Sequence, residues 1–300
     1  MGKRIKRNKI VSLVLTAFMM VSVFAVSIPQ QAEAAGSLNL SFKNGKGKST
    51  VTISDRECTG ATNKIAYIKF KPKVPGYITV KMTNASSVRD AAGFMYLCNN
   101  KKKAISHKKE QYETNRSQSW FYTRTFGVRK NKIYYLAVES RGGGVKVTAN
   151  IKAASKSNAN TQGKAKNLNP GKKVNGVIIA GENKADWYKF NIKNKKMIRV
   201  SLSAKTNGAV AGQGDGDFSG IKYTVYKSDG KKLGDDYASP STNSTWSEYF
   251  KRIYYNGYPT TQTTGLDTGT YYIKVERHKN TSSGFYTLSW KYINRLSSSY

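Results

Sequence analysis

Two stretches of the chain, "KNKIYYLAVES" at residues 130–140 and "TGTYYIKVERH" at residues 268–278, share a pattern that indicates the fold class. Each contains a Tyr-Tyr pair, two further residues and then Val-Glu. In the second stretch Tyr271, Ile273 and Val275 alternate with the residues between them, which is the period of a β-strand with one buried face. The chain therefore contains two closely similar β-strands, one near its middle and one near its end.

Similar segments surround these two strands and occur in the same order. Three further pairs match: "AYIKFKPKVPGYITVKM" (66–82) with "DWYKFNIKNKKMIRVSL" (186–202), "FMYLCNNKKKAI" (94–105) with "KYTVYKSDGKKL" (222–233), and "GVKVTANI" (144–151) with "FYTLSWKY" (285–292). The offset grows along the chain, so the second copy contains extra loop residues. Preserved order and spacing predict two tandem copies of one domain.

The patterning in both copies is that of short strands separated by turns. In "FYTLSWKYI" the residues Tyr286, Leu288 and Trp290 share one face. Turns are expected at "PG" (75–76), "SDG" (228–230), "DTG" (267–269) and "SSG" (282–284). Trp187 and Trp290 are both expected in the cores. No segment after the N-terminal region has the apolar stripe of an amphipathic helix. The sequence predicts an all-β protein of two tandem antiparallel, jelly-roll-like β-sandwich domains.

The N-terminus has the pattern of a secretory signal. Five basic residues precede an apolar run over residues 10–28, and Pro29, Ala32 and Ala34 follow in the small-residue pattern of a cleavage site. We expect cleavage after Ala34 and a mature chain outside the cell with no membrane span. Because the apolar run is 19 residues long, an uncleaved membrane anchor stays open as the alternative.

These features predict four regions. Residues 1–34 are the signal peptide, residues 35–151 the first sandwich domain, and residues 167–300 the second. Between them, "KAASKSNANTQGKAK" at residues 152–166 contains no aromatic residue and only alanine as apolar content. We expect this segment to be a flexible linker.

The second copy resembles the bacterial pre-peptidase C-terminal domain, a β-sandwich attached to secreted peptidases and other exported proteins. "GVIIAGENKADWYKF" (176–190) is similar to the early strands of that family, and "LDTGTYYIKVERHKNTSSGFYTLSW" (266–290) to its closing hairpin. The likeness covers roughly residues 170–293. The first copy is more divergent, since Ala66 stands where the second copy has Asp186. The resemblance implies a non-catalytic bacterial domain that is secreted or associated with the cell wall.

The resemblance also raises the question of calcium. Relatives that bind collagen hold Ca²⁺ with acidic residues in the linker and in the loop before the aromatic strand, and here Asn183 and Asp186 match that loop. The matching linker positions offer Asn167 and Asn169 without an acid, so the charge that a hard cation prefers is missing. A calcium site at Asn183 and Asp186 therefore stays open, in the second domain only.

No catalytic constellation is evident in the sequence. The two histidines, His107 and His278, lie in different copies, and no motif of a known hydrolase class occurs. We expect the protein not to be an enzyme and to need no cofactor. The two cysteines, Cys58 and Cys98, lie in the first copy. Because secreted proteins fold in an oxidising compartment, we expect these cysteines to form a disulfide.

The charge points to anionic partners. With 51 Lys and Arg against 17 Asp and Glu, the formal net charge is +34, and such a field favours polyanions. The densest cluster follows the "FMYLC" strand and consists of Lys101, Lys102, Lys103, Lys108 and Lys109. We expect this turn to project into solvent and to bind anionic polysaccharide, teichoic acid or glycosaminoglycan. Outward-facing tyrosines could stack on sugars, a form of carbohydrate binding. Two alternatives stay open: an accessory or structural subunit that binds another secreted protein, such as a peptidase, and extracellular nucleic-acid binding.

Overall fold

The computed structural model describes residues 38–54, 65–85, 91–108, 111–114, 123–207, 220–238, 254–255, 258–259 and 265–293. The expected signal peptide, Cys58 and Lys109 lie outside these ranges. The described part of the chain contains no helix long and apolar enough to cross a membrane. Its regular structure is almost entirely β, with only two short 3₁₀ turns, η1 (Lys43–Gly45) and η2 (Gln162–Lys164).

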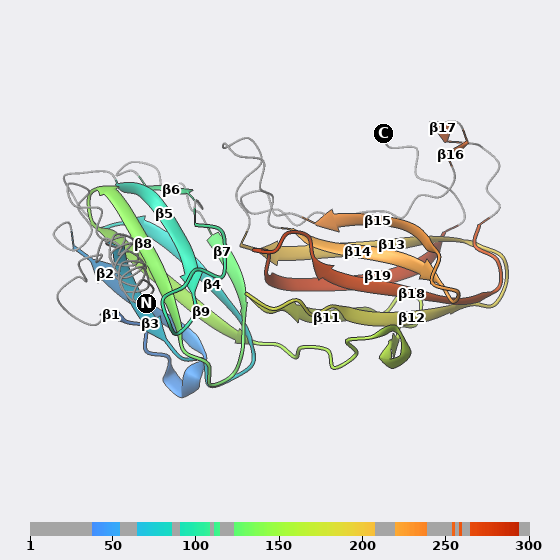
Figure 1. Cartoon of the computed structure of the whole chain (residues 1–300), viewed down its shortest axis with the longest axis horizontal. Coiled ribbons are helices and arrows are strands. Elements are labelled where there is room, and N and C mark those ends of the chain that lie inside the picture. Colours follow the sequence, from blue (N-terminus) through green and yellow to red (C-terminus); the bar gives the residue numbers. More distant parts are fainter. Residues whose placement is uncertain are drawn as a thin grey trace, which may run out of the picture. The chain divides into compact units, whose positions relative to one another are not determined.

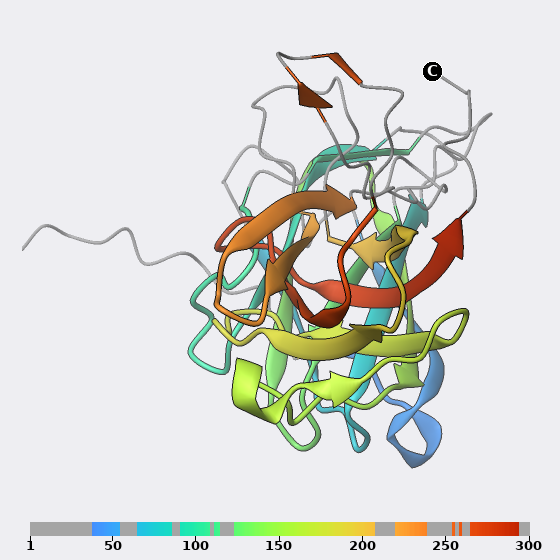
Figure 2. The ribbon, with the colours of Figure 1, turned by 90° about the vertical axis from the view of Figure 1, so that its right-hand side faces the viewer.

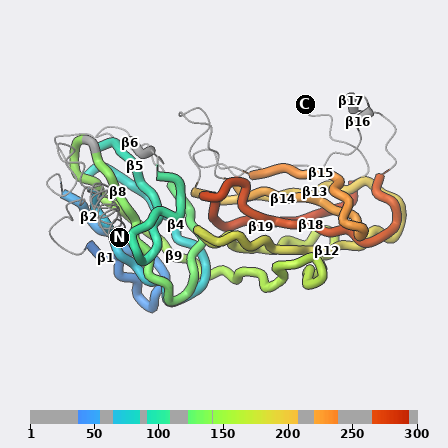
Figure 3. The backbone as a smooth tube through the Cα atoms, viewed as in Figure 1, coloured from blue at the N-terminus to red at the C-terminus, as the bar shows by residue number. Residues whose placement is uncertain are grey.

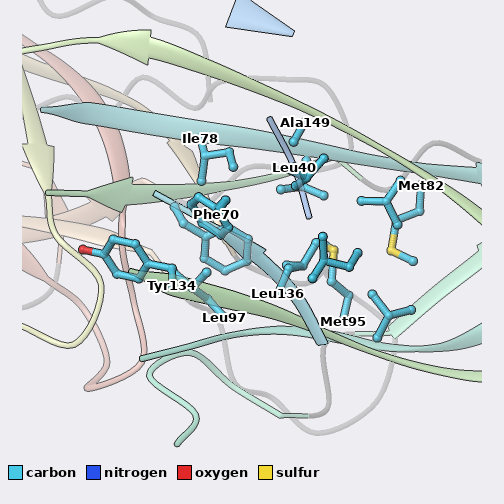
Figure 4. Packing of buried hydrophobic residues seen from close by; sticks show 14 of the residues in the cluster. Leu40, Phe70, Ile78, Met82, Met95, Leu97, Tyr134, Leu136 and Ala149 are labelled. Atoms are coloured by element: carbon cyan, nitrogen blue, oxygen red, sulfur yellow. The ribbon is translucent and has the colours of Figure 1, made fainter. Parts of the chain in front are cut away.

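The first sandwich consists of two facing sheets with the strand orders β1-β3-β8-β5-β6 and β2-β9-β4-β7. Its strands are β1 (Leu38–Asn39), β2 (Gly47–Ile53), β3 (Ile65–Phe70), β4 (Gly76–Asn84), β5 (Ala91–Cys98), β6 (Gln111–Thr114), β7 (Thr123–Val128), β8 (Tyr134–Gly142) and β9 (Val145–Ala153). Inward residues of both sheets form one core, part of which Figure 4 shows around Phe70, Leu97 and Leu136.

The second sandwich repeats this plan with sheets β10-β12-β18-β14-β15 and β11-β19-β13. Its strands are β10 (Lys166–Asn167), β11 (Lys173–Ile178), β12 (Asp186–Ile192), β13 (Met197–Thr206), β14 (Ile221–Lys227), β15 (Lys232–Ala238), β18 (Gly269–Arg277) and β19 (Gly284–Ile293). A separate two-stranded sheet pairs β16 (Tyr254–Tyr255) with β17 (Tyr258–Pro259). Figures 1 and 3 show the blue-to-green strands in the first sandwich and the yellow-to-red strands in the second.

The two sandwiches agree strand by strand. In both, a two-residue strand pairs in parallel with the edge of the larger sheet, as β1 does with β3 and β10 with β12. All the other strand pairs of the two sandwiches are antiparallel. The strand β7 is the exception, since no described strand of the second sandwich pairs with β13 in the same way. The predicted all-β class and antiparallel sandwich architecture are confirmed.

One aromatic pair recurs in both cores with the same geometry. Phe70 stacks on Tyr134 with ring centroids 5.5 Å apart and an interplanar angle of 21°, and Phe190 stacks on Tyr271 with the same two values. The tyrosines are the first residues of the two Tyr-Tyr pairs, so each Tyr-Tyr strand turns its first tyrosine inward. Tyr135 and Tyr272, the second tyrosines, lie on the outer faces and are half-buried.

The expectation that both Trp187 and Trp290 are core residues is wrong for Trp187. Trp290 is 1% exposed and donates its indole N–H to the carbonyl oxygen of Leu168 at 2.6 Å. On β12, however, Asp186, Tyr188 and Phe190 face inward, and strand alternation turns Trp187 outward, where it is half-buried. The outer face of this sheet therefore carries an indole ring.

The segment predicted as a flexible linker, residues 152–166, is packed along the second sandwich. Ala159 is 2% exposed, and its carbonyl oxygen accepts a hydrogen bond from the backbone N–H of Trp187 at 2.7 Å. Ser157 and Ala165 are also buried. Figures 1 and 2 both show this yellow-green segment running beside β12. Its small side chains allow close contact with the strand edge, a role that polar composition alone did not reveal.

Strand β7 contacts the segment that follows β11. Gly127 forms a parallel bridge with Ile179, and its carbonyl oxygen accepts the backbone N–H of Ala180 at 3.0 Å. A Cβ atom on Gly127 would lie 2.2 Å from the carbonyl oxygen of Ile178, so only glycine allows this approach. Beside it, the guanidinium of Arg129 binds both carboxylate oxygens of Glu182, with one contact at 2.6 Å.

Candidate polyanion-binding surface

The lysine-rich turn after β5 is ordered by one asparagine. The side-chain oxygen of Asn99 accepts the backbone N–H groups of Lys101 at 2.9 Å and of Lys103 at 3.0 Å. The backbone of Asn99 also bonds that of Lys102 and Lys103. An asparagine that mimics a backbone turn in this way favours a tight reversal. The turn therefore presents its lysines in a defined arrangement.

A short return strand fixes the turn to β5. Ala104 forms an antiparallel bridge with Cys98, and the backbone N–H groups of Ile105 and Ser106 both bond the carbonyl oxygen of Leu97. The hydroxyl of Ser106 in turn accepts the N–H of Leu97 at 2.9 Å. These contacts hold the base of the turn on a buried strand.

Lys102 lies over the outer face of the first sandwich instead of projecting into solvent. It has a left-handed backbone conformation with φ of 56°. Its ammonium group is 4.9 Å from the ring centroid of Tyr67 and 5.6 Å from that of Tyr135. The two rings meet edge to face at 6.3 Å. A cation held over aromatic rings contributes about 0.5–1 kcal/mol at such sites, which helps to offset the backbone strain.

Lys101, Lys103 and Lys108 are the exposed members of the predicted cluster. Within the described part of the chain, none of these three forms an ion pair. The predicted cluster thus divides into three exposed lysines, one that caps the tyrosines, and Lys109, which lies outside the described residues. The sequence analysis did not predict Tyr67 and Tyr135 as partners of the lysines. Their alternation with the inward residues of β3 and β8 could have indicated that both lie on the outer face.

The floor of this surface is apolar and includes Cys98. Ile65, Tyr96, Cys98 and Ala137 form a small buried cluster on the outer side of the sheet. Burial is the main cause that raises the pKa of the Cys98 thiol, to about 12, so the thiol is protonated at neutral pH. Cys98 is a free thiol in this structure. Because Cys58 lies outside the described residues, the disulfide remains a prediction.

The matching face of the second sandwich carries aromatic residues with a different charge pattern. The rings of Trp187 and Tyr226 lie with centroids 5.6 Å apart, and the ammonium group of Lys274 is 6.0 Å from the indole centroid. Lys274 also pairs with Glu276 at 2.7 Å, and Asp235 binds Lys222 and Lys232. Acids thus pair with several lysines of this face, whereas Lys101, Lys103 and Lys108 of the first sandwich form no ion pair with another described residue.

The residues proposed for calcium do not come together as a metal site. Asn183 is exposed, whereas Asp186 is fully buried. The two carboxylate oxygens of Asp186 bind Lys156 at 2.9 Å and the Tyr286 hydroxyl at 2.7 Å. Among the described residues there is no group of three or more His, Cys, Asp or Glu side chains that could hold a metal. A cation cannot share this carboxylate with an ammonium group already in contact with it, so the residues present do not fit calcium.

The histidine of the second sandwich, His278, stacks on an aromatic ring. His278 packs flat on Tyr237, with centroids 4.2 Å apart and an interplanar angle of 15°. Burial, and then the charges of Lys279 and Lys222, lower the pKa of His278. The imidazole is therefore neutral at physiological pH and adds no charge to this surface.

Comparisons with known proteins give distant likenesses only. No family model matches the chain, and no curated protein matches it. Among solved structures, the pre-peptidase C-terminal domain of a collagenase from Bacillus anthracis is 18% identical; the match covers 47% of this chain and 100% of that chain, with a TM-score of 0.28. Tripeptidyl peptidase 2 is 10% identical over 85% of this chain and 24% of its own, with a TM-score of 0.29. A human CUB1-EGF-CUB2 fragment of MASP-1/3 is 8% identical over 82% of this chain and 99% of its own, with a TM-score of 0.22.

Proposed function

We propose that the protein is a secreted, non-catalytic module of two tandem pre-peptidase-C-terminal-like sandwiches that binds anionic polymers of the cell wall or extracellular matrix. The binding surface is the lysine turn of the first sandwich together with Tyr67 and Tyr135. The observation that carries the proposal is the ordered turn that keeps Lys101, Lys103 and Lys108 exposed, with no acidic partner among the described residues. The family assignment rests on the sequence motifs and the repeated strand order.

The electrostatics favour a polymer over a small anion. The full sequence has a net charge of +34, and most of this excess lies after residue 34. The resulting field concentrates polyanions near the surface and speeds their encounter. At about 0.1 M salt, exposed charges more than about 10 Å apart are screened from one another. Local clusters therefore decide where the polymer settles, and the Asn99 turn holds three exposed lysines within ten residues of sequence. A repeating anionic chain can contact several of them at once.

The tyrosines give the surface a second kind of contact. Sugar rings pack on aromatic faces, and lysines nearby can bind their sulfate, phosphate or carboxylate groups. Because Lys102 lies over both rings, a bound acidic sugar would meet an ammonium group and the ring edges together. This arrangement suits acidic polysaccharide, glycosaminoglycan or teichoic acid better than a neutral glycan.

The test replaces the exposed lysines and measures binding as a function of salt. A Lys101→Gln/Lys103→Gln/Lys108→Gln variant is compared with a charge-matched control, Lys172→Gln/Lys173→Gln/Lys184→Gln, which changes three exposed lysines of the second sandwich. Immobilised heparin and poly(glycerol phosphate) teichoic acid serve as probes. If each lost contact contributes roughly 0.5 kcal/mol, the first variant binds roughly tenfold more weakly at physiological salt.

The salt dependence of the affinity distinguishes direct contacts of the turn lysines with the polymer from attraction by the total charge. For electrostatic binding the logarithm of the affinity falls linearly with the logarithm of the salt concentration, and the slope counts the neutralised charges. The turn variant should have a shallower slope than the wild type, and the control should keep the wild-type slope. Equal weakening in both variants would mean that only the total charge matters and that the turn is no site.

Two further binding arms test the alternatives. Duplex DNA at the same salt tests nucleic-acid binding, which the charge permits but no recognisable motif supports. Tighter binding to DNA than to both polysaccharide probes would replace the proposed ligand class. If no polymer binds at physiological salt and a secreted peptidase does, the accessory-subunit alternative replaces it.

A further inference from the structure

A buried ion pair joins the segment between the sandwiches to the second sandwich. The Lys156 ammonium group lies 2.9 Å from Oδ1 of Asp186. The Asp186 side chain is 0% exposed and that of Lys156 is 15% exposed. The same ammonium group lies 3.5 Å from the carbonyl oxygen of Val177. Lys156 thus places a positive charge among oxygen atoms inside the fold.

The other oxygen of Asp186 is held by a chain of two tyrosines. Oδ2 accepts the hydroxyl of Tyr286 at 2.7 Å, and the hydroxyl groups of Tyr286 and Tyr188 are 2.8 Å apart. Tyr286 is fully buried, and its ring crosses above Gly176, where a Cβ atom would lie 2.3 Å from the ring. The carboxylate therefore has a partner on each oxygen, and three strands, β11, β12 and β19, build its surroundings.

Lys156 is delivered by a segment that is itself bound at several points. The hydroxyl of Ser157 accepts the backbone N–H of Ala159 at 3.2 Å, and Ala159 bonds to Trp187 on the strand edge. Farther along, β10 pairs in parallel with β12. The ammonium group therefore reaches Asp186 from a backbone that already follows β12.

A buried carboxylate is costly unless a positive charge and hydrogen bonds compensate it. A metal ion could supply that charge, but among the described residues no group of three or more His, Cys, Asp or Glu side chains could hold one. Here the linker supplies Lys156 instead. We propose that the Lys156 ammonium group is a built-in cation that takes the place of a metal and fastens residues 152–166 to the second sandwich without calcium.

The first sandwich shows what the same positions contain when no such cation is present. In the strand registers, Asp186 and Tyr188 correspond to Ala66 and Ile68, and Gly176 and Tyr286 correspond to Ile53 and Val145. All four residues of the first sandwich are apolar and buried. The buried carboxylate, the two tyrosine hydroxyls and the glycine therefore occur together only in the sandwich in which Lys156 contacts the carboxylate.

The test removes the charges one at a time in the full chain. Lys156→Met leaves the carboxylate buried without its cation. Lys156→Met/Asp186→Asn removes both charges, and Lys164→Met changes an exposed lysine of the same segment as a control. Thermal unfolding and limited trypsin digestion of residues 152–166 are measured for each variant, in calcium chloride and in EDTA.

We expect Lys156→Met to lower the melting temperature of the second sandwich by about 10 °C and to expose the segment to trypsin. The double variant should recover at least half of that loss, and Lys164→Met should behave as the wild type. Calcium and EDTA should leave the wild-type melting temperature unchanged.

Three results would overturn the inference. The first is a wild-type melting temperature that rises with calcium or falls with EDTA, because the site would then hold a metal. The second is a Lys156→Met variant as stable as Lys164→Met. The third is a double variant no more stable than Lys156→Met, because the loss would then come from packing of the lysine stem and not from the unpaired carboxylate. The polymer-binding assay does not enter these readouts, so the two proposals can fail separately.

Discussion

The two sandwiches share their strand order apart from β7, but their interiors differ at one end. The first closes Ala66, Ile68, Ile53 and Val145 into an apolar cluster, whereas the second places a carboxylate and two tyrosine hydroxyls at the matching positions. The cores elsewhere agree closely, down to the stacking of Phe70 on Tyr134 and of Phe190 on Tyr271. One fold can therefore hold a dry interior or a polar network at the same place, provided that a neighbouring segment supplies the missing charge.

The outer faces differ in charge for a similar reason. In the first sandwich Lys102 covers two tyrosines, and Lys101, Lys103 and Lys108 form no ion pair with another described residue. In the second, acids on β15 and β18 pair with the lysines around Trp187 and Tyr226. A shared scaffold thus carries three exposed lysines without an ion pair among the described residues in one sandwich, and lysines paired with acids in the other.

The strongest test of this difference moves the carboxylate into the first sandwich. Ala66→Asp would bury an acid at the position matching Asp186 with no lysine beside it. We expect a loss of about 4 kcal/mol in the free energy of unfolding of the first sandwich, measured by urea denaturation. Ala66→Asn has nearly the same size without the charge and should cost clearly less. Equal losses in the two variants would show that size, not charge, distinguishes the positions.

The reverse exchange brings an apolar residue of the first sandwich into the second. Gly176→Ile would place a side chain where the ring of Tyr286 crosses the strand. The ring has to move, so we expect a loss of about 3 kcal/mol in the free energy of unfolding. Adding Tyr286→Val, the residue of the first sandwich, should recover much of it because the space is then free. A Gly176→Ile variant with wild-type stability would contradict the close crossing.

The contact between β7 and the segment after β11 can be tested at Gly127, because β7 has no counterpart among the described strands of the second sandwich. Gly127→Ala would force a Cβ atom against the carbonyl oxygen of Ile178. We expect a loss of about 2 kcal/mol, together with a wider separation between the unfolding transitions of the two sandwiches in calorimetry. Gly163→Ala, at a position with open space around it, is the control. Unchanged transitions in both variants would show that this contact contributes little.

The smallest expected effect is a loss of stability at acid pH caused by protonation of Glu182, which pairs with Arg129 next to this contact. Burial alone would raise the pKa of Glu182, but the hydrogen bonds and charge of Arg129 outweigh it and lower the pKa. A lowered pKa in the folded chain means stability that is present above the ordinary glutamate pKa and lost as the pH falls through the folded value. Since Arg129 is 44% exposed, the contribution is below about 1 kcal/mol.

Glu182→Gln should remove this part of the acid sensitivity and leave neutral-pH stability almost unchanged. Melting temperatures measured between pH 7 and pH 3 for the wild type and the variant provide the check. Parallel curves for the two proteins would show that Glu182 does not titrate with the lowered pKa that the contact requires.

Much of the architecture follows from local patterning. The alternation in Tyr271, Ile273 and Val275, and in Tyr286, Leu288 and Trp290, places the observed buried faces correctly. Trp187 shows the limit of this reasoning. Because Trp187 and Tyr188 are adjacent aromatic residues, either could face inward, and only the phase set by Phe190 and Ile192 turns the tryptophan outward. The alternation set by Phe190 and Ile192 therefore predicts an outward Trp187.

Several strands and their order along the chain could be predicted from the sequence alone, because side-chain alternation has a period of two and needs no knowledge of distant contacts. The excess of positive charge follows directly from the composition. The sequence also located the lysine turn. The partners of the charged side chains became clear only from the three-dimensional fold. Lys102 meets Tyr67 and Tyr135, and Lys156 meets Asp186, across 30 residues or more of sequence. Such pairs depend on how strands register and where a connecting segment settles, and those distances arise only when the whole chain has folded.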